Sequence, residues 1–76
     1  MAISIDSDYA APHSNRGIIL FEADELDESL AAYNRALELD PKYAFALNNR
    51  GLVYKAKGEY VAAIADYNAA LELSPR

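Results

Sequence analysis

The sequence predicts an all-α protein in which two helix-turn-helix units, four helices in total, follow each other in tandem. Three observations favour this fold class. A shift of the 76-residue sequence by 34 positions aligns 16 identical pairs among 42, and self-similarity at such a period indicates a repeat architecture. Alanine occurs 15 times beside many leucine and glutamate residues, a composition that favours helix. Proline recurs at positions 41 and 75, where such units would end, and Gly58 stands where the second unit would turn.

The repeat divides the chain into one unit at residues 9–42 and a second at residues 43–76. The clearest matches pair Asn15–Gly17 with Asn49–Gly51, and Tyr33–Leu39 with Tyr67–Leu73. Residues 1–8 align at the same offset with 35–42, so they are interpreted as the tail of a preceding unit. We therefore expect the chain to be a section of a longer array, either natural or engineered.

Each unit predicts two helices, and we expect the four at residues 9–22, 26–38, 43–56 and 60–73. Apolar and small residues recur every three or four positions in these segments, which is the helical period. Gly58 supplies the turn between the last two helices, and Pro41 and Pro75 end the two units because proline lacks the donor that continues a helix. Pro12 is expected in the first turn of its helix, where a backbone N–H would have no acceptor within the helix and its absence costs little.

Glycines inside the first helix of each unit predict close helix contacts. A helical glycine costs about 1 kcal/mol relative to alanine, so some packing advantage must offset it. We expect Gly51 to face Ala63, and Gly17 to face Ser29. The wider gaps between helices are expected to be filled by the larger side chains Leu20, Tyr33, Tyr54 and Tyr67.

Charge and composition exclude several function classes. The net charge of −5 opposes binding to nucleic acid or to an anionic membrane surface. The chain contains no cysteine and a single histidine, His13, for which we expect a packing role. The acidic run from Glu22 to Glu28 does not match a calcium-binding loop, and acids are expected at a helix start. We expect no enzyme activity, no metal and no cofactor, and a cytoplasmic location because no apolar run could span a bilayer.

The second unit resembles the tetratricopeptide repeat (TPR) family. The residues that carry the resemblance, in order within one 34-residue period, are Leu47, Gly51, Tyr54, Gly58, Tyr60, Ala63, Tyr67, Ala70 and Pro75. The first unit departs from the pattern at His13, Asp24, Leu26 and Ser29, which predicts looser packing there. Arg50 occupies a slot that the family usually gives to leucine, and we expect it to pair with Asp66 or a nearby carbonyl group.

The resemblance implies a short right-handed α-solenoid that binds a peptide or partner protein on its concave face. That face is lined by the first helix of each unit. In this sequence it would comprise Ser14, Ile18, Phe21, Glu22, Phe45, Asn48, Asn49, Leu52 and Lys55. Its large apolar members favour an amphipathic or hydrophobic peptide. Asn49 matches a family position that clamps C-terminal carboxylates, but Ser14 and Ile18 stand where that clamp needs a lysine and an asparagine, which argues against it.

An alternative function is structural self-assembly, with another copy of the chain as the main partner. Repeat units do not bury their outer faces alone, so the ends of an array stay unsatisfied without a cap. Residues 1–40 carry a net charge of −7 and residues 41–76 carry +2, which favours head-to-tail contact. The residues expected at the two ends are Ile3, Ile5, Tyr9, Ile64, Leu71 and Leu73.

Overall fold

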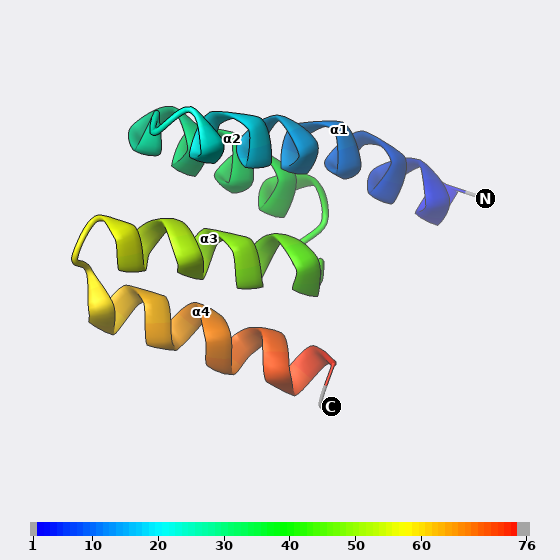
Figure 1. The fold of residues 1–76 in the computed structure, drawn as a ribbon. Helices are drawn as coiled ribbons and strands as arrows, with labels where there is room; N and C mark the ends of the chain where they lie inside the picture. The colour runs from blue at the N-terminus through cyan, green and yellow to red at the C-terminus, as the bar shows by residue number, and fades with distance from the viewer. Residues whose placement is uncertain (1, 75–76) are drawn as a thin grey trace.

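The part of the chain that the structure describes forms four α-helices, as the sequence predicts. The computed structural model describes the backbone of residues 2–74 and the side chains of residues 9–74, so Pro75 and the side chains of Ile3 and Ile5 lie outside the described residues. The helices are α1 (Ala2–Glu22), α2 (Leu26–Leu39), α3 (Ala44–Ala56) and α4 (Tyr60–Leu73). Each helix packs against the next along the chain, and α1 also touches α3 (Figure 1). Two antiparallel helix pairs are thereby stacked as tandem helix-turn-helix units.

The first helix starts earlier than expected. Residues 2–8 are helical and continuous with the rest of α1, so the turn that would separate them from residue 9 is not formed. The repeat explains why, because Ser7 stands at the position of Pro41 and nothing there stops a helix. Pro12 therefore lies inside α1 and not in its first turn, contrary to the expectation. There it removes one main-chain hydrogen bond at a cost of about 3 kcal/mol.

The turn within each unit has the same geometry, although its residues differ. Asp24 and Gly58, which are 34 positions apart, both have positive φ angles, 66° and 82°. The amides that follow them close the same pattern of hydrogen bonds, from Glu25 N to Leu20 O and from Glu59 N to Tyr54 O. This arrangement is a Schellman motif, which ends a helix by placing one residue in the left-handed conformation. Aspartate thus takes the role that glycine has in the second unit.

The two glycines inside helices permit close contact, but mainly with tyrosine rings. A Cβ atom on Gly17 would lie 2.7 Å from Tyr33 Cζ, and one on Gly51 would lie 2.7 Å from Tyr67 Cε1. Ser29 does face Gly17, since its hydroxyl donates a 2.7 Å hydrogen bond to the Gly17 carbonyl oxygen. The expectation that Gly51 packs chiefly on Ala63 needs correction, because the ring one turn further along α4 occupies the nearest space.

The core lies between α1, α2 and α3. Ala10, Tyr33, Ala36, Ala46 and Val53 form one buried cluster, and partly buried leucine, isoleucine and phenylalanine side chains surround it. The first unit is therefore not loosely packed, contrary to the expectation from its departures, because α3 covers it. Within residues 2–74, none of the helices combines the length and apolar character that a membrane span needs.

Candidate functional site

A groove opens between the first helices of the two units. It encloses about 260 Å³ and is lined from α1 by Ile18, Phe21 and Glu22, from α2 by Tyr33, and from α3 by Phe45, Asn49 and Leu52. The spacing explains this arrangement, because residues three or four apart share one face of a helix. α1 and α3 present the same face of successive repeats to the same side.

Most residues predicted for the concave face meet in this groove. Ile18, Phe21, Glu22, Phe45, Asn49 and Leu52 all line it. Asn48 instead lines a second hollow, and Lys55 is exposed but lines neither. Tyr33 belongs to the groove as well as to the core, which sequence reasoning missed because the same ring also packs on Gly17.

The expectation for Ser14 is wrong. Its side chain is fully buried, and its Oγ atom has no hydrogen-bond partner among the described residues. Ala10, Ser14 and Gly17 are spaced four and three residues apart and form the buried stripe of α1. Ser14 therefore faces the interior and presents no atom to a peptide in the groove.

The groove is mostly apolar, and the polar side chains of Glu22 and Asn49 also line it. Phe45 is 47% exposed and Leu52 is 40% exposed, so both offer apolar surface to a ligand. The Phe45 ring lies 5.8 Å from the Tyr43 ring in a tilted arrangement, which helps to hold it in place. The Asn49 amide can donate and accept hydrogen bonds, and the Glu22 carboxylate can accept them. Such a surface can bind apolar side chains and also pair with the polar backbone that carries them.

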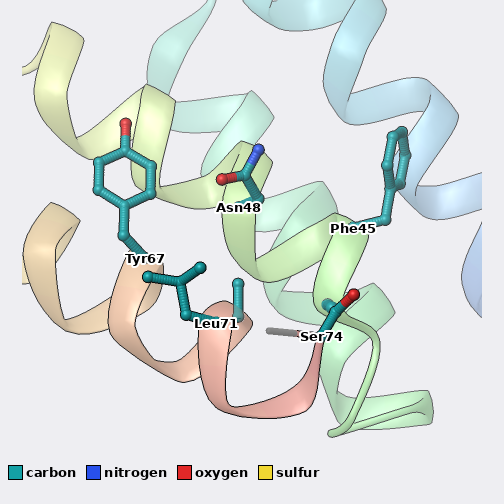
Figure 2. Close-up of a pocket in the computed structure, with 7 residues that line it drawn as sticks. Phe45, Asn48, Tyr67, Leu71 and Ser74 are labelled. Atoms are coloured by element: carbon teal, nitrogen blue, oxygen red, sulfur yellow. The ribbon is translucent and has the colours of Figure 1, made fainter. Parts of the chain in front are cut away.

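A second and larger hollow lies on the other side of α3, toward α4. It encloses about 490 Å³, and its lining residues are Ala44, Phe45, Asn48, Tyr67, Ala70, Leu71 and Ser74. Figure 2 shows Leu71 and Tyr67 on α4 facing Asn48 on α3, with Ser74 at the end of α4. Leu71 is 54% exposed, so this hollow also has an apolar wall that the described residues leave open.

Arg50 connects the two units. Its guanidinium donates hydrogen bonds to both carboxylate oxygens of Asp66 on α4, and to Asn34 Oδ1 on α2. The pairing expected between Arg50 and Asp66 is thus confirmed. These hydrogen bonds to Asp66 raise the pKa of Arg50 above its ordinary value. Arg50 also lies 5.7 Å from the Tyr54 ring centre, a cation–π distance. Arg50 therefore ties α3 both to α4 of its own unit and to α2 of the first unit.

The acidic turn of the first unit faces a lysine of the second. Lys57 forms an ion pair with Asp27, and this hydrogen bond raises the pKa of Lys57. This pair links the two units, although an exposed pair contributes little to stability. Among the described residues, no group of histidine, cysteine, aspartate and glutamate side chains could hold a metal ion.

Comparison with known families agrees with this architecture. A family model described as TPR repeat matches residues 19–58, and one described as tetratricopeptide repeat matches residues 44–76, while residues 1–18 lie outside both matches. A search of curated proteins found no match to the chain. Repeats of this family are non-catalytic scaffolds that generally mediate protein–protein interactions. The first match alone spans more than half of the sequence, and the chain therefore belongs to the tetratricopeptide repeat family.

Proposed function

We propose that the chain is a protein-binding module whose groove between α1 and α3 takes an apolar or amphipathic peptide segment. The observation that carries this proposal is the meeting of four large apolar side chains, from the first helices of both units, around one opening. These side chains are Ile18, Phe21, Phe45 and Leu52. Burial of such surface is the main favourable term in most protein association.

The volume and composition of the groove favour a ligand that inserts apolar side chains over one that lies flat on the surface. Its volume of about 260 Å³ suits one or two apolar side chains, whereas drug-sized ligand sites usually start at about 300 Å³. A bound peptide can bury its apolar side chains against the apolar lining while its backbone pairs with the amide of Asn49, which also lines the groove. The Glu22 carboxylate further favours a basic residue at that end of the peptide.

The proposal is tested by selecting ligands from a library of short random peptides displayed on phage. The parent protein should enrich sequences with spaced apolar residues, and a Phe45→Ala/Leu52→Ala variant should lose at least about tenfold in affinity for them, or 1.4 kcal/mol. Leu52→Ala alone should show part of this loss, which isolates the groove because Phe45 also borders the second hollow.

A matched control comes from Val61, which is 85% exposed on α4 and lines neither hollow. Val61→Ala should leave the affinity for the selected peptides unchanged. If the double variant enriches the same peptides with the same affinity as the parent protein, binding in this groove is ruled out. Circular dichroism of each variant establishes that its helices are intact before binding is compared.

A further inference from the structure

The repeat shows what the hollow between α3 and α4 is shaped to receive. Moving its lining residues back by 34 positions gives the same place in the first unit, where Ala10, Ser14, Tyr33 and Ala36 are at most 1% exposed. Helix α3 covers that place, because its Ala46 and Val53 belong to the same buried cluster. The hollow on the second unit is therefore equivalent to the place on the first unit against which α3 packs.

The apolar residues of α4 repeat this relationship. Ile64, Leu71 and Leu73 are between 41% and 57% exposed. Their counterparts 34 positions earlier, Leu30, Leu37 and Leu39, all pack against the core. Equivalent apolar side chains thus pack against the core in the first unit and stay exposed on α4, which no helix follows among the described residues.

Helix α1 carries the matching outer face. Tyr9 is 60% exposed and Ile19 is 66% exposed, and the two lie on one side of the helix together with Arg16. Their counterparts are Tyr43, just before α3, which is partly buried against the core, and Val53 on α3, which is fully buried. α1 therefore exposes much of the surface by which α3 packs against the first unit.

A polar pair recurs in the same register. Within the chain, Arg50 donates a 2.8 Å hydrogen bond across the unit boundary to Asn34 Oδ1. The counterparts of these two residues are Arg16 on α1 and Asn68 on α4, and both are exposed. Docking α1 of one copy on α4 of another would bring Arg16 close to Asn68, just as Arg50 lies close to Asn34 within the chain.

We propose that a second copy of the chain docks its α1 into the hollow between α3 and α4, as α3 lies on α2. The contact continues an interface that the chain already contains, and it brings the acidic residues 1–40 of one copy to the basic residues 41–76 of the other. Pro12 and His13 replace Ala46 and Leu47 in this register, so the contact is weaker than the internal one. Because such a contact is head-to-tail, it extends into short chains of copies.

Sedimentation velocity from micromolar to millimolar concentration tests the proposal. The parent protein should show a mass that rises with concentration, and both Leu71→Glu, on the α4 side, and Ile19→Glu, on the α1 side, should remain monomeric. Ala65→Glu is the matched control, because Ala65 is exposed and its counterpart Ala31 stays exposed beside α3. The control should associate as the parent does. A parent protein that is monomeric throughout would overturn the proposal.

Mixing the two blocked variants tests the head-to-tail direction. The Leu71→Glu copy keeps a working α1 face and the Ile19→Glu copy keeps a working α4 face, so the mixture should form dimers and nothing larger. A mixture that stays monomeric, from variants that circular dichroism shows to be folded, would contradict this arrangement. Leu52→Ala should associate normally, which separates this result from failure of the groove to bind peptide.

A substitution at the exposed polar pair tests the register with little expected effect on folding, because surface substitutions usually change stability by about 0.5 kcal/mol or less. Asn68→Asp gives Arg16 of the docked copy a carboxylate partner, and charge-assisted hydrogen bonds are about twice as strong as neutral ones. The association constant should rise several-fold, and the gain should vanish in high salt or when Arg16→Ala is added. An Asn68→Asp variant that associates no better than the parent at low salt would place Arg16 elsewhere and overturn the register.

Discussion

Nε and Nη2 of Arg50 each lie 2.8 Å from a carboxylate oxygen of Asp66, which gives a bidentate ion pair between α3 and α4. The side chain of Asp66 is only 8% exposed and that of Arg50 is 22% exposed, so water screens the pair weakly. The remaining donor, Nη1, reaches Asn34 on α2. One guanidinium therefore fixes α4 within its own unit and the second unit against the first.

Arg50→Leu should destabilise the protein strongly. The substitution leaves the Asp66 carboxylate buried without its partner, and breaking a buried pair in this way costs about 3–5 kcal/mol in free energy of unfolding. The double variant Arg50→Leu/Asp66→Ala should recover most of this loss, because it leaves no uncompensated charge. The first unit already has alanine at the equivalent position, Ala32. Urea unfolding followed by circular dichroism measures all three free energies.

Arg35 provides the matched control for this prediction. It pairs with Glu38 at 3.0 Å, but the two side chains are 56% and 66% exposed. Exposed pairs contribute about 0–1 kcal/mol, so Arg35→Leu should change the free energy of unfolding little. Equal losses from Arg50→Leu and Arg35→Leu would show that burial does not set the strength of the Asp66 pair.

The two glycines that contact tyrosine rings should respond differently to alanine. Gly17→Ala places a Cβ atom 2.7 Å from the Tyr33 ring, which is 1% exposed and belongs to the buried core cluster. Overpacking of this kind typically costs about 1–3 kcal/mol. Tyr67 is only partly buried and borders the open hollow, so its ring can shift away from an alanine at Gly51. Gly51→Ala should therefore be close to neutral, helped by about 1 kcal/mol of helix propensity.

Thermal unfolding of both alanine variants measures this difference. Gly17→Ala should lower the melting temperature clearly more than Gly51→Ala. The two substitutions are chemically the same and occur at equivalent positions, so each is the control for the other. An equal decrease in both would show that Tyr67 is held as firmly as Tyr33, and that the hollow beside it is closed in solution.

The sequence repeat predicted the fold and three of the four helices to within one residue at each end. Both depend on spacing along the chain. The place of Arg50 in the family pattern predicted its pairing with Asp66 or a nearby carbonyl group, and the structure shows Asp66. The start of α1 was missed because it depends on Ser7 at a position where the repeat has proline. Ser14 was misplaced because the family resemblance assigned it to the concave face, although it lies in helical phase with the buried residues Ala10 and Gly17. The partner of Gly51 was likewise decided by the crossing of α3 and α4, which fixes whether Ala63 or Tyr67 lies nearest.

Asp24 offers a route to greater stability. Its φ angle of 66° is one that non-glycine residues adopt at a cost of about 1–2 kcal/mol, although aspartate tolerates it better than most. Asp24→Gly should therefore raise the free energy of unfolding by about 0.5 kcal/mol, after the greater freedom of glycine in the unfolded chain is subtracted. Gly58→Ala should do the reverse and cost about 1 kcal/mol, since a Cβ there meets no atom and only backbone strain remains. Urea unfolding measures both, and a destabilised Asp24→Gly would contradict the strain argument.

Tyr33 should make the protein sensitive to alkaline pH. Burial raises the pKa of Tyr33 to about 12, whereas the unfolded chain ionises it near the ordinary value of about 10. The folded state thus keeps a proton that the unfolded state loses first, so this contribution to stability is complete below about pH 10 and falls as pH rises toward about 12. Tyr33→Phe keeps the ring over Gly17 and removes the ionisable hydroxyl, so its urea midpoint should decline less over this range. Tyr60→Phe is the control, because Tyr60 is 61% exposed and the slope should match that of the parent protein. If Tyr33→Phe loses stability as steeply as the parent between these pH values, Tyr33 is not the group that senses alkali.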